Sequence, residues 1–270
     1  MKKPFRSKVR EFGMKYCSGL YDRYSDWVRT RLPAEGMVVD GPGFQIEIDA
    51  PQVSVIGRSL YRTGIWEPEV TDFVRKVVEP GWHMLDIGAH IGYYTLLFAK
   101  RTGEGGRVVA FEPMPRERAI LERNILLNNL SGIGVFPYAL SDRRGHAVMA
   151  PECRGQMRPG AREEEPDTVE MLPLDSIWND IAWERLDMVK VDVEGAEMGV
   201  LQGMQKVLER FRPNLLLEIH PLQLKAFDSS AEAVVDWLRK NFGYAFTPID
   251  SDSAEFKEEN LTLWGSVPEK

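Results

Sequence analysis

The sequence predicts an α/β fold in which helices cover both faces of a mostly parallel sheet. Short apolar runs of strand length alternate with longer stretches whose apolar residues recur every three or four positions, as on an amphipathic helix. Several runs end in an acidic residue, and such sheets bind ligands at the carboxyl ends of their strands. Strands are expected at 84–87, 107–111, 133–140, 188–193 and 215–221, with a closing pair at 245–249 and 261–267.

The expected helices lie between these strands. They cover residues 69–78, a stretch that begins near Ile91, residues 115–130, residues 200–211, and a last helix opened by a capping box from Ser229 to Glu232. Residues 143–170 contain scattered glycine and proline and are expected to be irregular. Their acidic run is typical of a solvated loop, although its position also suits a lid over the site.

Composition limits the class of protein. The chain has 270 residues, is 43% hydrophobic and 28% charged, and carries a net charge of -7, which argues against nonspecific binding of nucleic acid. Its two cysteines, Cys17 and Cys153, lie far apart and exclude a disulfide framework or a zinc site. With neither a secretory signal nor an apolar run of membrane-spanning length, the expected location is the cytoplasm.

The N-terminal part differs in charge from the rest, which predicts an extension over 1–63 and a main domain over 64–270. Nine lysines and arginines fall among the first 31 residues, and apolar residues recur at helical spacing from Phe5 to Leu20. A basic amphipathic helix over residues 1–33 can lie on an anionic membrane surface, but packing against the domain or a partner subunit is favoured. Short strands are expected over 36–63.

A glycine turn follows the strand 84–87. Gly88 and Gly92 bracket it, and a helix starts at once, so backbone N–H groups and a helix N-terminus would face a ligand. The next strand ends in Glu112-Pro113, where a carboxylate can accept hydrogen bonds from ribose hydroxyls.

Three nucleotide ligands compete for this turn. A P-loop needs Gly-Lys-Ser or Gly-Lys-Thr, which is absent here. A dinucleotide site needs Gly-x-Gly-x-x-Gly and would bring a pyrophosphate close to Asp86, where like charges repel. S-adenosylmethionine (SAM) fits better, because its sulfonium and ammonium suit Asp86, its carboxylate suits the helix N-terminus and its ribose suits Glu112. The alternative is an ordinary strand–turn–helix unit whose glycines only shape the turn.

A second acidic stretch follows the strand 188–193. Burying Lys190 beside Asp192 in a core strand costs free energy unless both find partners, so function is the simplest reason for them. The strand ends of 188–193 and 215–221 carry Asp192, Glu194, Glu197, Glu218 and His220.

Three further residues are candidate ligand contacts. Ser141 and Asp142 end the strand 133–140, so Asp142 can accept a hydrogen bond from an adenine amino group or serve only as a turn former. Glu67 precedes Pro68 and is either a ligand contact or a charge at a helix start.

Together these motifs resemble the FkbM family of SAM-dependent methyltransferases over roughly residues 60–225. The matching stretches are Gly64-Ile-Trp-Glu-Pro68, Leu85-Asp-Ile-Gly-Ala-His-Ile-Gly-Tyr-Tyr-Thr95, Ala110-Phe-Glu-Pro113, Asn128-Asn129, Ala139-Leu-Ser-Asp142 and Val189-Lys-Val-Asp-Val-Glu-Gly-Ala-Glu197. The resemblance implies a class I (Rossmann-like) methyltransferase fold and O-methylation of a sugar, a glycan or a polyketide-type metabolite. His90 stands where the family usually has Asn, which we interpret as a tolerated change on the turn.

The resemblance also implies residue roles. The implied cofactor-binding residues are Glu67, Asp86, Gly88, Ala89, His90, Gly92, Tyr93, Glu112, Pro113, Ser141, Asp142 and Asp192. Asp192 and Glu194 would lie closest to the transferable methyl, with His220 across the pocket.

Methyl transfer to a hydroxyl needs a base. His220 is the first candidate, because its unperturbed pKa of about 6.5 suits the task, and Asp192 or Glu194 is the second. A structural role for His220 is the alternative. Magnesium or manganese held by Asp192, Glu194 and His220 would also lower the hydroxyl pKa but is not favoured. The other functions left open are N-methylation of an amine and SAM binding without catalysis.

Overall fold

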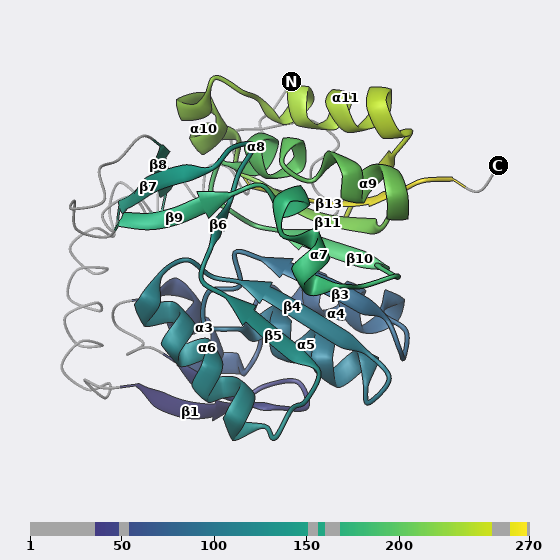
Figure 1. Ribbon diagram of the computed structural model, residues 1–270. Helices are drawn as coiled ribbons and strands as arrows, with labels where there is room; N and C mark the ends of the chain where they lie inside the picture. Colours follow the sequence, from purple (N-terminus) through teal and green to yellow (C-terminus); the bar gives the residue numbers. More distant parts are fainter. Residues whose placement is uncertain (1–35, 49–53, 151–155, 160–167, 250–259, 269–270) are drawn as a thin grey trace, which may run out of the picture.

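The computed structural model describes residues 36–48, 54–150, 156–159, 168–249 and 260–268, and its centre is a seven-stranded sheet (Figure 1). The strand order is β12-β13-β11-β10-β3-β4-β5. The strands are β3 (His83–Ile87), β4 (Arg107–Phe111), β5 (Ile133–Phe136), β10 (Met188–Val191), β11 (Asn214–Ile219), β12 (Ala245–Pro248) and β13 (Leu261–Ser266).

Six of the seven strands of this sheet run in the same direction, and β13 runs in the opposite direction. The expected mostly parallel sheet is therefore confirmed. The chain builds β3, β4 and β5 outward in one direction and β10 and β11 in the other. The order therefore reverses between β3 and β10, and ligands of open α/β sheets bind beyond the strand ends at such a point.

Helices cover both faces of the sheet because successive strand residues point to opposite sides. Met84 and Val108 pack with α4 (Pro68–Val77) and α5 (Tyr93–Thr102), whereas Leu85 and Val109 belong to the core under the later helices. Figure 1 shows α3 (Val55–Thr63) to α6 on one side and α8 to α11 on the other. The remaining helices named here are α6 (Pro115–Leu127), α7 (Trp178–Ile181), α8 (Glu197–Gln202), α9 (Gln205–Phe211), α10 (Pro221–Leu224) and α11 (Ala231–Phe242), with short 3₁₀ turns at Leu174–Ser176 and Lys225–Phe227.

Two helix predictions need correction. The expected helix 200–211 is two helices, because the chain breaks between α8 and α9 at Gly203, a poor helix former. The cap of α11 is Ser230, one residue after the expected Ser229, and its Oγ accepts a hydrogen bond from the N–H of Ala233 at 3.2 Å. No helix in the described ranges is long and apolar enough to cross a membrane.

The N-terminal described residues form a hairpin, β1 (Met37–Asp40) with β2 (Gln45–Ile48), and then α3 (Val55–Thr63). The prediction of short strands over 36–63 is confirmed for the hairpin and wrong for α3. The β-branched residues at its start suggested a strand, but Ser54 caps a helix there by accepting a hydrogen bond from Gly57 N–H at 2.8 Å. The basic segment 1–33 lies outside the described residues.

Asn124 of α6 and Asn128, the residue that directly follows this helix, hold the outer edge of β2, an arrangement we name the asparagine clasp. The amide of Asn124 accepts from Glu47 N–H at 2.5 Å and donates to Glu47 C=O at 3.0 Å. The amide of Asn128 does the same with Gln45, at 2.8 and 2.6 Å. Side chains thus replace a neighbouring strand along this edge.

A second sheet, ordered β6-β9-β7-β8, follows the carboxyl end of β5 (Figure 1). Its strands are β6 (Ala139–Leu140), β7 (Gly145–Ala150), β8 (Gln156–Pro159) and β9 (Thr168–Leu172). The expectation of irregular structure over 143–170 is therefore wrong for its described part, and its acidic run at 163–165 lies outside the described residues. The single expected strand 133–140 is also wrong, because Pro137 has no N–H for a ladder and separates β5 from β6.

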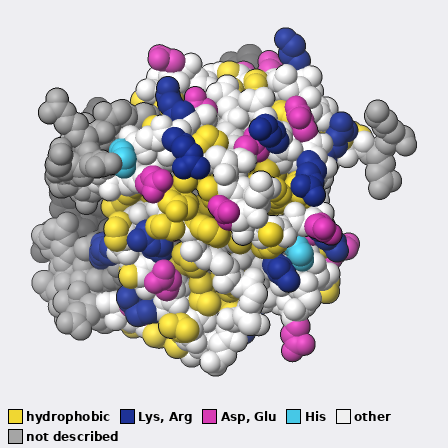
Figure 2. All heavy atoms as spheres, in the orientation of Figure 1, with side chains coloured by type: hydrophobic (Ala, Val, Ile, Leu, Met, Phe, Trp, Pro, Cys, Tyr) yellow, Lys and Arg dark blue, Asp and Glu magenta, His cyan; other side chains and the backbone are white. Residues whose placement is uncertain are grey.

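One face of the molecule has hydrophobic side chains across its middle, with most charged groups around them (Figure 2). The edge strand β5 is half-buried along its length, and Leu126 near the end of α6 is 74% exposed. Apolar surface thus remains partly open to solvent at this edge of the sheet.

Candidate active site

Residues 88–92, here called the glycine loop, join β3 to α5. Gly88 has φ +82°, and a Cβ on it would lie 1.9 Å from the carbonyl oxygen of Asp192. Only glycine allows this approach, since it lacks a Cβ and accepts a left-handed φ. The glycine loop therefore lies directly against the carboxyl end of β10, where the second acidic stretch begins.

Asp86, in β3 just before the glycine loop, is fully buried. Its Oδ2 accepts a hydrogen bond from Thr95 Oγ1 at 2.5 Å, whereas its Oδ1 has no hydrogen-bond partner among the described residues. Burial raises the pKa of Asp86, while the positive charge of Lys190 opposes this shift. A buried carboxylate oxygen without a donor suits a cationic or hydrogen-bonding ligand, as expected for the SAM ammonium or sulfonium.

Glu112, at the end of β4, is held by the backbone. Its Oε2 accepts from His90 N–H at 2.7 Å and its Oε1 from Met114 N–H at 2.8 Å. Burial raises the pKa of Glu112 to about 7 despite these two hydrogen bonds. His90 adopts a left-handed φ of +50°, which aims its N–H at Glu112, and Pro113 C=O accepts from Arg118 Nη1 at 2.9 Å.

Glu67 points into the protein. It stands at the cap position of α4 with φ +42°, but its carboxylate makes no capping hydrogen bond to that helix. Instead its Oε2 accepts from the hydroxyl of Tyr94 at 2.7 Å. Burial and then the negative charge of Glu218 raise the pKa of Glu67 to about 7, so Glu67 belongs electrostatically to the strand-end carboxylates.

Lys190 has the partners that its burial requires. Its Nζ donates to Asp192 Oδ2 at 2.8 Å and lies 4.9 Å from the centre of the Tyr94 ring. Burial would raise the pKa of Asp192, but the charges of Lys190 and His220 lower it. Asp192 therefore remains ionised beside a fixed cation.

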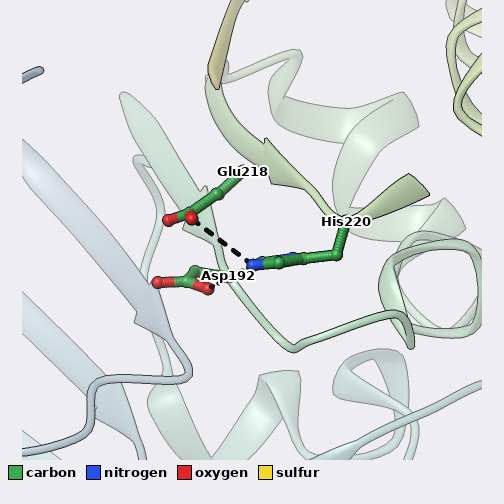
Figure 3. Close-up of side chains that lie close together, drawn as sticks. All are labelled: Asp192, Glu218 and His220. Carbon is green, nitrogen blue, oxygen red and sulfur yellow. Dashed lines mark ion pairs between the residues drawn. The ribbon is translucent and has the colours of Figure 1, made fainter. Parts of the chain in front are cut away.

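His220 lies at the end of β11 among four carboxylates, and we call this set (Asp192, Glu194, Glu197, Glu218 and His220) the His220 cluster. Its Nδ1 is 2.8 Å from Glu197 Oε1. Its Nε2 is 3.3 Å from Glu218, 3.6 Å from Glu194 and 3.8 Å from Asp192. Figure 3 shows His220 facing Glu218 and Asp192.

The imidazole of His220 is charged in this surrounding. Burial alone would lower the pKa of His220, but hydrogen bonds with Glu197 and Glu218, together with the charges of Asp192 and Glu194, raise it to about 11. The expected pKa of about 6.5 is therefore wrong for His220. An imidazolium at neutral pH donates protons and cannot itself be the resting base.

Candidate metal-ligand atoms of Asp192, Glu218 and His220 lie within 4.8 Å of one another. A divalent metal held there would have to displace the proton of His220 and compete with the ammonium of Lys190, which donates to Asp192 Oδ2 at 2.8 Å. The cations that contact these carboxylates are Lys190 and His220.

Ser141 and Asp142 border a pocket of about 140 Å³ between the end of β6 and α8. Ser141 Oγ donates to Asp142 Oδ1 at 3.1 Å. The pocket also reaches Gly195, next to Glu194, so it adjoins the His220 cluster. Its other lining residues are Arg143, Ala196, Met198, Gly199, Gln202 and Phe227.

The structure thus gathers the expected residues into three adjoining groups: the glycine loop with Asp86 and Glu112, the pocket at Ser141 and Asp142, and the His220 cluster. The sequence predicted a functional reason for burying Lys190 and strand-end positions for Glu197 and Glu218, but it assigned no specific site role to these residues or to Tyr94. A signal existed for Glu197, which opens α8 three residues after Glu194, so its side chain can lean back toward the strand end.

Known proteins provide an independent comparison. A family model described as methyltransferase FkbM domain matches residues 86–246. The AMB antimetabolite synthetase AmbE of Pseudomonas aeruginosa is 26% identical in an alignment of 241 residues that covers 73% of this chain and 11% of AmbE. Methyltransferase sdnD of Sordaria araneosa is 29% identical over 169 residues (50% of this chain, 65% of sdnD). The 2-O-methyltransferase NoeI of Sinorhizobium fredii is 27% identical over 158 residues (52% of this chain, 64% of NoeI). The chain spans less than two thirds of the length of each of these relatives.

The reversed strand order, the glycine loop and the acidic strand ends define a class I, Rossmann-like methyltransferase domain, whose cofactor is SAM. Since the family model covers more than half of the sequence, this chain belongs to the FkbM methyltransferase family. The family, the fold class and the cofactor expected from the sequence are thereby confirmed.

Proposed function

We propose that this protein transfers the methyl group of SAM to a hydroxyl of a small-molecule acceptor, such as a sugar, a glycan unit or a polyketide-type metabolite. One observation carries the proposal: Gly88 of the glycine loop lies directly against the backbone of Asp192, whose carboxylate belongs to the His220 cluster. The printed name of NoeI, a 2-O-methyltransferase, supports oxygen as the methylated atom.

The glycine loop and its two carboxylates hold the cofactor. Asp86 receives the cationic end through its free Oδ1, and Glu112 accepts the ribose hydroxyls. Gly88, Ala89, His90 and Gly92 supply the loop backbone, Tyr93 begins α5, and Pro113 follows Glu112 at the end of β4. Ser141 and Asp142 face the adenine from their pocket, while Glu67 and Asp192 border the reactive end.

When bound, SAM supplies an electrophilic methyl group on its sulfonium, and transfer to oxygen breaks the carbon–sulfur bond and leaves S-adenosylhomocysteine (SAH). The chain must align the acceptor and remove its hydroxyl proton. Glu194 takes this proton, because its side chain is 31% exposed whereas His220 is 1% exposed. Asp192, held by Lys190, remains the fixed negative charge beside it. His220 donates toward these carboxylates and balances their charge.

The test is a methylation assay of the full chain with SAM and a panel of hydroxylated acceptors, scored by SAH release and by the mass of the product. Amine acceptors of similar shape belong in the same panel. We expect methyl ethers from at least one hydroxylated class, and a strong loss of product with Glu194→Gln. The matched control is Glu209→Gln, an exposed residue on α9.

Two outcomes contradict the proposal. Methylated amines without any methyl ether would transfer the activity to nitrogen, where a base matters less because the nucleophile is already deprotonated. Tight binding of SAH by a folded protein that turns over no acceptor in the panel would support the non-catalytic alternative.

A further inference from the structure

The second imidazole nitrogen of His220 contacts a residue that the proposed reaction does not use. Glu197 and His220 are both buried, at 0% and 1% exposure, and Glu197 Oε1 lies 2.8 Å from His220 Nδ1. The same oxygen accepts from Gly195 N–H at 3.0 Å. The other oxygen, Oε2, has no partner among the described residues, so this carboxylate is directed at one imidazole nitrogen and one backbone N–H.

The chain between β10 and α8 is shaped to place this carboxylate. Glu194 and Gly195 both have left-handed φ values, +51° and +106°, which turn the backbone sharply before α8. A Cβ on Gly195 would lie 2.7 Å from Cβ of Gln223, so α10 packs directly on this turn. Gln223 Nε2 also donates to Glu194 Oε2 at 3.3 Å. The turn and α10 together hold the Glu197 carboxylate next to Nδ1 of His220.

We propose that Glu197 is a positioning residue for the methyl transfer, which holds a proton on Nδ1 of His220 and thereby directs the Nε2–H toward Glu194, Asp192 and Glu218. The hydrogen bond made by one imidazole nitrogen sets which nitrogen carries the proton and how the ring is turned. This inference rests on the proposed function for its effect on rate, but its structural part does not.

The charged groups that face His220 favour a proton on both of its imidazole nitrogens. Glu197 comes from α8, Glu194 from the turn after β10, Asp192 from the end of β10 and Glu218 from β11. Lys190 of β10 is the other cation and is bonded to Asp192. Acceptors therefore surround both imidazole nitrogens, and Glu197 alone faces Nδ1 among the ion pairs of the described residues.

The first experiment is ¹⁵N NMR of the imidazole groups in the full chain labelled at histidine. The chain has 4 histidines, so the His220 signals are assigned by removing those of His83, His90 and His146 in turn. We expect a protonated Nδ1 in the unmodified protein at neutral pH. A neutral ring with bare Nδ1 and a proton only on Nε2 would overturn the proposal without reference to methylation.

The second experiment compares Glu197→Ala with Glu197→Gln. Alanine removes the acceptor, and kcat should fall about 10- to 100-fold, the rate equivalent of one lost hydrogen bond to a charged group. KM for SAM should stay near its original value, because Glu197 lies beyond His220. Glutamine keeps one oxygen for Nδ1 and Gly195, and its new NH₂ replaces the unpartnered Oε2, so Glu197→Gln should retain the Nδ1 proton and most of kcat.

The control is Glu209→Ala on the exposed face of α9, which should change neither kcat nor the His220 spectrum. An unchanged kcat in Glu197→Ala, or an equal loss in both Glu197 variants with the Nδ1 proton retained in each, contradicts positioning. If Glu197→Ala does not fold, the spectra of the unmodified protein and of Glu197→Gln still decide. If no acceptor is ever methylated, the proposed function fails, while the spectra still test the positioning.

Discussion

Carboxylates on the two sides of the candidate site are stabilised in different ways. Asp86 and Glu112, beside the glycine loop, accept from a hydroxyl and from backbone N–H groups, and burial raises the pKa of both. The carboxylates of the His220 cluster surround two cations of the chain itself, Lys190 and His220. Neither Asp86 nor Glu112 bonds a cation among the described residues, which suits one carboxylate proposed to receive the cationic end of SAM and one proposed to accept its ribose hydroxyls. The second set brings its own cations and can stay ionised while it handles a proton.

The sharpest way to break this comparison is to neutralise the carboxylate proposed as base. Glu194→Gln should lower kcat about 100- to 10,000-fold, the usual contribution of general base catalysis. The affinity for SAH, measured by calorimetry, should stay unchanged because the residues beside the glycine loop are intact. An unchanged kcat in Glu194→Gln, or a loss of SAH affinity as large as the loss of kcat, would contradict the assignment of cofactor binding to one side and proton removal to the other.

Removing the lysine from the second set should cost folding stability. Lys190→Met keeps a side chain of similar length but removes the cation nearest to Asp192 and to the buried Asp86. The substitution should lower the free energy of unfolding by about 3 to 5 kcal/mol. Urea unfolding of Lys190→Met beside the exposed control Lys206→Met measures this. Equal midpoints for the two variants would mean that Lys190 contributes no net stabilisation.

Asp86→Asn should weaken binding on the first side only. The amide retains the hydrogen bond from Thr95 but removes the charge proposed to meet the cofactor ammonium. The SAH dissociation constant should rise about 10- to 100-fold, as expected for one hydrogen bond to a charged group. The NMR signals of His220 should stay in place, and a large shift of them would show that the two sides are coupled.

The smallest effect on cofactor affinity is expected from pH. Glu112 has a pKa of about 7 in the folded protein against 4.5 in the unfolded chain, so the folded state binds the extra proton and stability falls as pH rises through that window. The penalty is complete above the folded pKa and amounts to about 3 kcal/mol. If ribose hydroxyls prefer the ionised carboxylate, SAH affinity should rise about 10-fold from about pH 6 to about pH 8.

The control for this titration is Glu112→Gln, which should flatten both the stability and the affinity profile. A binding curve that keeps its slope in Glu112→Gln would assign the titration to another group.

Strand ends were the most predictable part of the molecule. Asp86, Glu112 and Asp192 could be placed from the sequence because the apolar runs before them are short and bounded by turn residues, and parallel strands bring their carboxyl ends to one edge. The second sheet could not be predicted, since polar and proline-containing strands such as Gln156–Pro159 lack an apolar pattern and form only by pairing with distant neighbours.

Side-chain electrostatics were less predictable than the fold. The charge of His220 depends on four carboxylates from α8, β11 and the end of β10, and no local pattern reveals how closely they surround one ring. Tyr94 lies on the buried side of α5, yet its hydroxyl also donates to Glu67 at 2.7 Å, which its helical position alone does not reveal. The division into 1–63 and 64–270 stays a prediction.

The asparagine clasp has a consequence for the behaviour of this chain at high concentration. An open strand edge is a template for pairing with another molecule. Because the amides of Asn124 and Asn128 occupy the outward N–H and C=O groups of Glu47 and Gln45, β2 offers no free ladder to a second copy along that stretch. The outer edge of β2 is thereby protected from intermolecular β-sheet growth, and slow hydrogen exchange at the amides of Gln45 and Glu47 would be the sign of that protection.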